Sequence, residues 1–411
     1  MTFPDDFWWG AGMSSVINEG AAPTSDLGAW EREGRLPTSE PGNGFASAFG
    51  DDLGLLAVHG LGHLRLTLDW ARIEPTNGHH DAEAIEHLRL VLGVARDAGL
   101  SVWGCLHDGP LPGWFAHDER GFRDERSRRY FWARHVEFVG EAFGDLVHGW
   151  VPVHEPSRWA MQGWLDGSRP PGGRDDSEAF AASLEAIHLA TVEAALRLRG
   201  GGRPVASSHW LVPVFPARLD PGSPPTADAE AMATVVDETL RRSWLRMIEE
   251  QTLVVPGRAP VEVPRAREAF DVIGFSYRHA LAVRGDGALL PYPQSLAVGA
   301  DGQVAWAEGL AVVLHQLADA LPERDLLVTG LGLATDDEAR REDHLREALA
   351  IASEALDDGM HLRGLWWETP IDARSGTAAG PGRRGLFGDN RDPRPAALLL
   401  AKVAEGGPLP T

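Results

Sequence analysis

Cysteine is nearly absent from this chain of 411 residues, in which Cys105 is the only one. A single cysteine excludes an intrachain disulfide framework and fits a reducing compartment. Cys105 lies in an apolar run, which favours a buried structural thiol over a nucleophile. The first residues, MTFPDDFWWG, place acids where a signal peptide needs basic residues. We therefore expect a cytoplasmic protein.

Basic residues are also scarce: 38 Lys and Arg stand against 60 Asp and Glu, which gives a formal net charge of -22. Such a charge repels nucleic acid and anionic membranes, so we expect neither as a partner. We find no window approaching the ~18 consecutive apolar residues of a membrane span. The pair His79-His80 has no companion ligands and lies in a loop, so we predict no metal site, and no cofactor is indicated. A homo-oligomer is compatible with the sequence.

What the chain does have is a repeated alternation of short apolar segments with helical patterns, punctuated by glycine. The expected strands are residues 7–12, 63–70, 100–106, 147–153, 205–211, 272–275, 326–328 and 362–367. The expected helices are residues 49–59, 82–98, 127–143, 177–198, 227–250, 307–321, 340–358 and 395–403. Eight such alternations predict an α/β fold, a single (β/α)8 TIM barrel that spans residues 1–411. Residues 20–45 are expected to form a long loop, and residues 212–226 and 278–306 loop insertions on the C-terminal face of the barrel.

Residues 151–156 (VPVHEP) are the clearest single strand end in this pattern. A short β-rich run stops at a carboxylate, Glu155, and the next residue is a proline that can begin a helix. On a barrel of this kind the catalytic groups lie at the C-terminal ends of the strands. Glu155 is therefore the first candidate for a catalytic residue.

The other strand ends carry polar and aromatic side chains as well. They supply Ile17, Asn18, Glu19, Arg65, Asp69, Trp70, His107, Asp108, His154, Glu155, Ser207, Ser208, His209, Trp210, Ser276, Tyr277, Thr329, Gly330, Trp366, Trp367 and Glu368. Tryptophan stacks on the apolar face of a sugar ring while polar groups bind its hydroxyls. Packing of the barrel rim is the more frequent role of any single tryptophan, but the whole set favours a carbohydrate-type pocket.

Motifs spread along nearly the whole chain carry a resemblance to a known family. They are residues 3–11 (FPDDFWWGA), 19–21 (EGA), 65–75 (RLTLDWARIEP), 107–114 (HDGPLPGW), 154–156 (HEP), 163–167 (GWLDG), 271–277 (DVIGFSY), 306–310 (WAEGL), 329–332 (TGLG) and 384–387 (RGLF). In this order they resemble glycoside hydrolase family 1, the retaining glycosidases of the β-glucosidase type. The resemblance implies the barrel fold and a small-molecule glycoside as substrate.

The resemblance also implies two catalytic carboxyls roughly 5–5.5 Å apart, an acid/base and a nucleophile. Glu155 matches the acid/base, in a His-Glu-Pro where the family has Asn-Glu-Pro. The nucleophile belongs to a Thr-Glu-Asn-Gly motif, which here corresponds to residues 329–332 (TGLG). Gly330 therefore stands at a vacant nucleophile position.

Several sugar contacts of the family are replaced as well. At these positions, Ile17 replaces a Gln of the family, His154 an Asn, Asp108 a Trp and Ser276 an Asn. The family residues that persist are Arg65, His107, Glu155, Tyr277 and Trp367.

Glu368, directly after Trp367, is a candidate for the missing carboxylate. It would serve as a displaced nucleophile, or as a base for water if it lies roughly 6.5–9.5 Å from Glu155. The alternative is an ion pair with Arg65, without a catalytic role. Asp69 and Asp108 are weaker candidates that fit hydrogen bonding at the rim. His154 either tunes Glu155 or binds a hydroxyl.

Three functions are compatible with this reading. The first is hydrolysis or transglycosylation of an O-glycoside, with Glu155 as general acid/base and a non-standard or missing nucleophile. The second is a non-catalytic pseudoenzyme that binds a glycoside. The third is a repurposed barrel of specialised metabolism that uses Glu155 and His154 for proton transfer on a non-sugar substrate. We rank the first, an enzyme, ahead of the other two.

Overall fold

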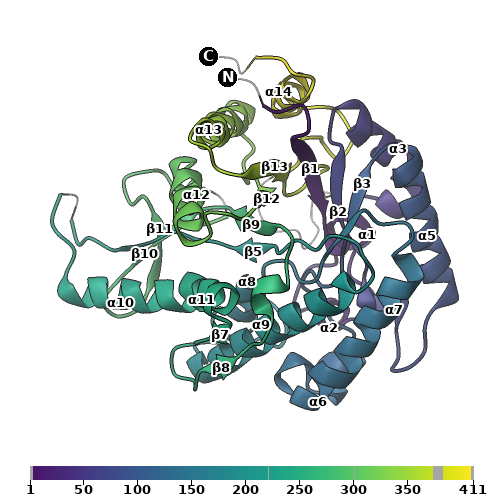
Figure 1. Ribbon diagram of the computed structural model, residues 1–411, viewed down its shortest axis with the longest axis horizontal. Helices are drawn as coiled ribbons and strands as arrows, with labels where there is room; N and C mark the ends of the chain where they lie inside the picture. The colour runs from purple at the N-terminus through teal and green to yellow at the C-terminus, as the bar shows by residue number, and fades with distance from the viewer. Residues whose placement is uncertain (1–2, 221, 300, 374–382, 409–411) are drawn as a thin grey trace.

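A ring of eight parallel strands forms the centre of the computed structural model, which describes residues 3–220, 222–299, 301–373 and 383–408 (Figure 1). The strands are β1 (Trp8–Met13), β2 (His63–Thr67), β3 (Ser101–Cys105), β4 (Gly149–Val151), β5 (His209–Trp210), β9 (Ile273–Tyr277), β12 (Leu326–Leu331) and β13 (Leu362–Trp367). Their order is β4-β3-β2-β1-β13-β12-β9-β5. Isolated parallel bridges join Trp150 of β4 to Val205, and Ala206 to Val272, so the ring closes at a seam between β4 and β5.

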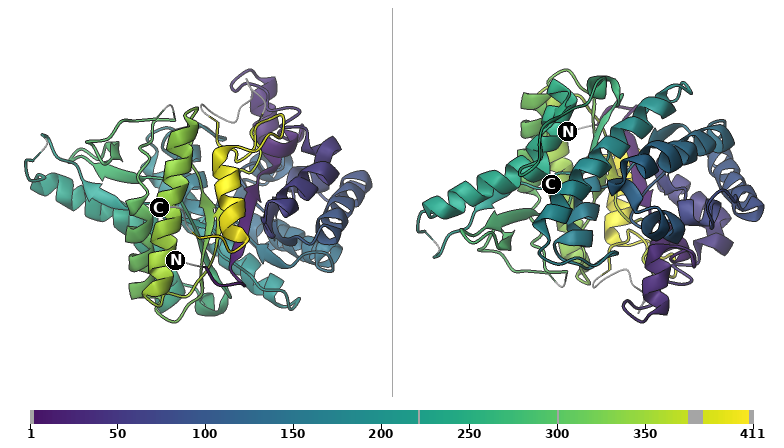
Figure 2. Two further views of the ribbon diagram at one scale, coloured as in Figure 1. Left: turned by 90° about the horizontal axis from the view of Figure 1, so that it is seen from above. Right: turned by 90° about the horizontal axis from the view of Figure 1, so that it is seen from below.

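Helices surround this ring on the outside, as the three views of the ribbon show (Figures 1 and 2). They include α3 (Phe45–Val58), α5 (Ala82–Asp97), α7 (Ala133–Phe143), α9 (Ser177–Arg199), α11 (Ser243–Glu250), α12 (Glu308–Ala320), α13 (Glu338–Asp357) and α14 (Pro395–Ala404). Local sequence sets their ends: Asp81, for example, caps α5 by accepting hydrogen bonds from the backbone N–H groups of Glu83 and Ala84. The predicted (β/α)8 fold is thereby confirmed.

The inside of the ring is filled by side chains and is not a channel. Seven buried residues form a hydrophobic cluster separate from the larger core between strands and helices: Trp103, Cys105, Val151, Ala206, Val272, Leu327 and Trp366. Such layers of inward-pointing side chains are typical of this barrel. Burial raises the pKa of the Cys105 thiol to about 12, although the charge of Arg65 acts in the opposite direction. The thiol is buried, as the sequence predicted.

The two expected loop insertions follow β5 and β9, and they contain short strands as well as loops. They contribute β6 (Val214–Pro216), β10 (Ala280–Val283) and β11 (Leu289–Tyr292), which form a three-stranded sheet. This sheet lies against α10 (Ala227–Asp237), and together they project from the barrel (Figure 1). The physical reason for these strands is burial: β10 is covered on both faces, so its backbone groups need the partners that neighbouring strands supply.

Other segments differ in detail from the expectation. The long loop over residues 20–45 contains the short helix α2 (Asp26–Arg32), which Ser25 caps by accepting from the backbone N–H of Gly28. The predicted helix over residues 227–250 runs as α10, the wider π-helical turn η4 (Glu238–Arg242) and α11.

One helix, α9, is long and apolar enough to cross a membrane by length and composition, contrary to the expectation that no window would approach this limit. However, 67% of its most apolar window is buried inside the structure. It packs against α7 and α8 (Pro156–Trp164), and its apolar side chains serve the core between helices and strands. A core helix meets the same test as a membrane span.

Candidate active site

A cavity of about 170 Å³ opens where the C-terminal ends of the strands meet. Of the residues predicted from the sequence, five line it: Ile17, Asp108, His154, Glu155 and Glu368. The volume is below the ~300–1,000 Å³ of pockets for drug-sized ligands. The cavity therefore suits a compact ligand.

Glu155 enters the cavity from an unusual backbone conformation. Its φ of 50° and ψ of 54° lie in the left-handed region, which costs a non-glycine residue about 1–2 kcal/mol. The backbone N–H of Glu155 donates to the carbonyl oxygen of Ser208 at 2.7 Å, and Pro156 begins α8 directly afterwards. The contact with Ser208 and the start of α8 at Pro156 thus fix the sharp turn between β4 and α8. This turn directs the carboxylate of Glu155 into the cavity.

The Glu155 carboxylate is held by three donors. Ser276 Oγ and Arg278 Nε donate to Oε1 at 2.6 and 2.8 Å, and Arg158 Nη1 donates to Oε2 at 2.9 Å. Burial opposes the charged form, but Arg278, Arg158 and His154 outweigh it, so the pKa of Glu155 lies well below its ordinary value. Glu155 is therefore ionised at neutral pH and is able to accept a proton rather than donate one.

Glu368 follows β13 and points into the same cavity. Its Oε1 contacts Arg278 Nη2 at 3.0 Å, Arg65 Nη2 at 3.1 Å and His154 Nε2 at 3.2 Å. Burial raises its pKa, but Arg278, His154 and Arg65 lower it further, to about 2. The other oxygen, Oε2, is buried and has no hydrogen-bond partner among the described residues. One oxygen of this ionised carboxylate is thus anchored and the other is unengaged.

Gly330 on β12 and Glu368 compete for the same space. A Cβ atom built on Gly330 would lie 2.1 Å from Glu368 Oε2 and 3.0 Å from Ser276 Cβ. The carboxylate from β13 therefore occupies the volume into which a side chain at position 330 would project. The vacancy predicted on β12 is filled from the neighbouring strand.

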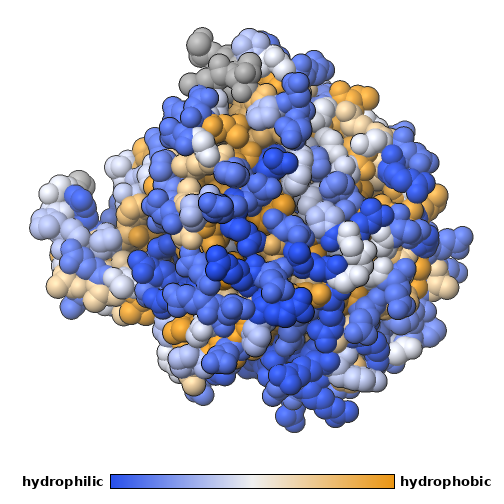
Figure 3. Space-filling model, in the orientation of Figure 1, coloured by the Kyte–Doolittle hydropathy of each residue, from blue (hydrophilic) through white to orange (hydrophobic). Residues whose placement is uncertain are grey.

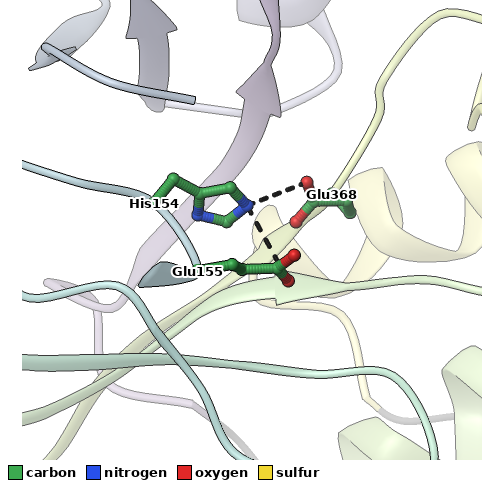
Figure 4. Close-up of side chains that lie close together, drawn as sticks. All are labelled: His154, Glu155 and Glu368. Carbon is green, nitrogen blue, oxygen red and sulfur yellow. Dashed lines mark hydrogen bonds and ion pairs between the residues drawn. The ribbon is translucent and has the colours of Figure 1, made fainter. Parts of the chain in front are cut away.

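The two carboxylates and His154 form a compact cluster (Figure 4). An oxygen of Glu155, an oxygen of Glu368 and a ring nitrogen of His154 all lie within 4.8 Å of one another. The two carboxylates therefore reach the same part of the cavity with at least one oxygen each. The other ring nitrogen of His154 contacts Ser208 Oγ at 2.7 Å, which fixes the orientation of the imidazole.

Three such ligands could hold a metal ion by distance alone, but their surroundings do not suit one. Arg278 donates to Oε1 of both carboxylates, and Arg65 also contacts Oε1 of Glu368. A cation at this point would face two guanidinium groups at short range. The cluster is an arginine–carboxylate network.

The remaining predicted residues do not line the cavity, although Arg65 contacts the cluster. Arg65 is fully buried and contacts Asp108 Oδ2 as well as Glu368, each at 3.1 Å. The ion pair between Arg65 and Glu368, the alternative to a catalytic role, is therefore present. Burial raises the pKa of Asp108, but Arg65 and His154 bring it below its ordinary value.

Four other predicted residues make structural contacts outside the cavity. Tyr277 donates to the carbonyl oxygen of Trp306, and the indole N–H of Trp367 donates to Arg384 O at 2.8 Å. His107 is buried against the ring edges of aromatic neighbours. Asp69 lies apart from the cavity and caps the short helix α4 (Trp70–Ile73).

Sequence reasoning missed the arginines of the cavity: Arg158, Arg169, Arg278 and Arg384. For two of these arginines, the sequence contains a pattern that indicates their position. Arg158 lies three residues after Glu155, a spacing that places both on one face of a helix. Arg278 directly follows Tyr277 at the end of an expected strand. Arg169 and Arg384 come from irregular segments, where no periodicity reveals the direction of a side chain.

Comparisons with known proteins agree with this geometry. A family model described as "Glycosyl hydrolase family 1" matches residues 1–205. The chain is similar to thermostable β-glucosidase B of Thermobispora bispora, at 25% identity over 90% of this chain and 83% of that protein. It is also similar to probable inactive β-glucosidase 25 of Arabidopsis thaliana, at 22% identity over 99% of this chain and 90% of that protein.

Two solved structures share the fold. A β-glycosidase from Pyrococcus horikoshii superimposes with a TM-score of 0.86 at 23% identity, covering 98% of this chain and 95% of that one. A family 1 β-glucosidase from Thermotoga maritima gives 0.87 at 18% identity, and the match covers the whole of both chains.

Proposed function

We propose that the chain, which matches the model of glycosyl hydrolase family 1 over residues 1–205 and is similar to a β-glucosidase over most of its length, cleaves or transfers an O-glycoside through Glu155 and Glu368. In this proposal Glu368 replaces the nucleophile that position 330 lacks. The observation that carries it is the pair of carboxylates with oxygens within 4.8 Å of each other at the strand ends of the barrel.

The first step is attack by Glu368. With a pKa of about 2 its carboxylate is ionised at neutral pH, and Oε2 has no hydrogen-bond partner among the described residues. A carboxylate oxygen of Glu368 forms a bond to the anomeric carbon while the bond from that carbon to the departing oxygen breaks and leaves its electron pair on the departing oxygen. Glu155 is ionised and has no proton to give. The departing group must therefore be stable as an anion, as an acidic phenol or a carboxylic acid is.

The second step uses Glu155 as a base. Its carboxylate accepts a proton from water or from the hydroxyl of an acceptor, whose oxygen then attacks the anomeric carbon. The bond between that carbon and Glu368 breaks, and the carboxylate is restored. Water gives hydrolysis, and another hydroxyl gives glycosyl transfer.

A second function, binding without turnover, is favoured by Arg278. Its guanidinium donates to both Glu155 and Glu368, so a sugar ring that approaches both carboxylates must displace these contacts. One relative of nearly full coverage, from Arabidopsis thaliana, is named as a probable inactive β-glucosidase.

Leaving-group dependence tests the proposal. We expect turnover of 2,4-dinitrophenyl β-glycosides and little or none of the matching alkyl β-glycosides. Glu368→Gln should lower kcat/KM by at least about 10³-fold. Glu354→Gln, on the exposed face of α13, is the matched control and should leave kcat/KM unchanged.

Two further measurements separate catalysis from binding. An activated 2-deoxy-2-fluoroglycoside should leave a covalent adduct on the peptide that contains Glu368, detected by mass spectrometry. Azide or formate should restore turnover to Glu368→Gly, because a small anion fits the space that the side chain vacates. Full activity of Glu368→Gln would overturn the proposal. Saturable sugar binding without turnover of any activated substrate would leave the binding function.

A further inference from the structure

Arginine gathers on one side of the cavity, although the protein as a whole is strongly acidic with a net charge of -22. Arg158, Arg169, Arg278 and Arg384 all line it. Arg278 is engaged by both carboxylates of the cluster. Among the described residues, Arg384 has one ion pair, a 3.4 Å contact with Asp301, and Arg169 has none. The positive charge of this side is therefore incompletely balanced.

The acids that line the cavity do not supply the missing balance. Glu155, Glu368 and Asp108 are engaged by Arg278, Arg158 and Arg65. The fourth, Asp26, is buried, and desolvation raises its pKa to about 7 even though the backbone N–H groups of Leu111 and Leu27 donate to it. At neutral pH it carries only part of a charge.

The pKa values of the cavity arginines reflect both their burial and the charges of neighbouring guanidinium groups. Burial, followed by the charge of Arg158, lowers the pKa of Arg169. Burial, followed by the charge of Arg278, lowers the pKa of Arg384 to about 10. An anion placed between these groups would relieve their mutual repulsion.

The position of the cavity arginines relative to Glu155 indicates which part of the ligand these arginines would contact. Oε1 of Glu155 faces Arg278, His154 and the Glu368 side of the cluster, whereas Oε2 contacts Arg158. The sugar ring belongs on the Glu368 side, where the anomeric carbon is attacked. Arg158 and its neighbour Arg169 therefore lie on the side of the departing or accepting group.

From this arrangement we propose that the departing group of the glycoside itself carries an anionic group, a carboxylate or a phosphate, which binds to Arg158, Arg169 and Arg384. This inference rests on the proposed glycoside function and names the class of its aglycone. Guanidinium groups bind carboxylates and phosphates through paired hydrogen bonds, with geometry as well as charge. Trp159 also lines the cavity, and an aromatic ring that bears the anion would pack against it.

Binding of free aglycones tests the inference without any turnover. Isothermal titration with 4-hydroxybenzoate and with its methyl ester compares a charged and a neutral ring of similar shape. We expect the acid to bind at least about tenfold more tightly. Phenyl phosphate and inorganic phosphate, titrated in parallel, tell which anion the site prefers and whether the ring is needed.

Variants locate the site. Arg169→Gln should remove most of the preference for the acid, and Arg169→Lys should restore part of it. Arg129→Gln, an exposed arginine of η3 (Arg128–Trp132), is the matched control for loss of one positive charge and should keep the preference. Thermal unfolding verifies that each variant folds. For the unaltered protein, affinity for the acid should fall between 0.05 and 0.5 M NaCl while affinity for the ester stays constant.

Turnover separates this inference from the proposed function. The β-glucosides of 4-hydroxybenzoate and of its methyl ester have matched shapes, and the ester is the better leaving group. A higher kcat/KM for the acid therefore reports recognition of charge. Equal binding of acid and ester overturns the anion site, even if phenyl glycosides are turned over. Binding that depends on Arg169 without turnover of any glycoside supports the anion site and overturns the catalytic proposal.

Discussion

At the scale of single residues, the pair Gly330 and Glu368 shows how two strands share one volume. Glu368 Oε2 lies where a Cβ of residue 330 would be, and Arg65, His154 and Arg278 hold Glu368 there through Oε1. Because φ of Gly330 is not in the left-handed region, the glycine is required for space and not for backbone freedom.

A double-mutant cycle measures this competition. Gly330→Ala should destabilise the protein by about 1–3 kcal/mol, because the new methyl group displaces an anchored carboxylate. In the background of Glu368→Ala the same substitution should cost far less, so the coupling energy should exceed about 1 kcal/mol. The measurement is urea unfolding of the four proteins. Additive effects of the two substitutions would contradict the shared volume.

The low pKa of Glu368 gives a pH dependence with a definite sign. Its folded-state pKa of about 2 lies below the ordinary 4.5, so the charge contributes stability that is fully present above pH 4.5 and is lost as the pH falls toward 2. The stability difference between the unaltered protein and Glu368→Gln should therefore shrink below pH 4.5. The slope is at most about 1.4 kcal/mol per pH unit for one proton. Chemical unfolding from pH 6 to 3 checks this, and a constant difference would contradict it.

At the scale of elements, residues 383–394 carry Arg384 to the cavity and depend on one buried acid. Asp372 Oδ1 accepts from the backbone N–H groups of Arg384 and Gly385 at 2.9 and 2.7 Å, and Oδ2 accepts from Arg394. Asp372 and Arg394 are both buried. The pair thus fixes the segment that presents one of the cavity's cations.

Asp372→Asn should accordingly have two effects. Removing one partner of a buried ion pair should destabilise the protein by about 3 kcal/mol. Arg384 should also be held less firmly, which should weaken binding of 4-hydroxybenzoate more than binding of its methyl ester. Asp336→Asn is the control, because Asp336 is exposed and its 3.7 Å contact with Arg383 should contribute less than about 1 kcal/mol. Thermal unfolding and titration provide both readouts.

The elements also show which features of the fold and the site could be predicted from the sequence. Buried strands appear as apolar runs, so β2 and β13 were placed within a few residues, and the acid at the end of β4 was found from the proline after it. The partners of Glu155 were not found, because the contacts of Arg278 with the two carboxylates join residues that are 123 and 90 positions apart. The small sheet of β6, β10 and β11 was missed because strands of three or four residues carry too little periodicity.

At the scale of the whole molecule, acids outnumber basic residues by 60 to 38, whereas four arginines line the cavity. The face in Figure 3 is largely hydrophilic, with apolar residues scattered between polar ones. A net charge of -22 produces repulsion between surface carboxylates, which opposes the compact state.

Salt should therefore act in opposite directions on stability and on binding. Raising NaCl from 0.02 to 0.5 M should screen the surface repulsion and raise Tm by roughly 1 °C for each kcal/mol of added stability, because the unfolding entropy of about 2.1 cal/mol/K per residue is large for a chain of 411 residues. Over the same range the affinity for an anionic aglycone should fall. Calorimetric scans and titrations at matched salt test the pair of trends, and a fall in Tm would contradict the first.

The seam of the barrel predicts which part of the molecule unfolds first. Two residues form β5 and three form β4, and between them Trp150 makes the joining backbone hydrogen bonds to Pro204 and Ala206. Local opening is easiest where the fewest bonds must break. Amide hydrogens at this junction should exchange with deuterium faster than those of β1, β2 and β12, as mass spectrometry of peptides would show. Since Glu155 lies four residues after the end of β4, mild denaturant should abolish activity while the rest of the ring is still folded.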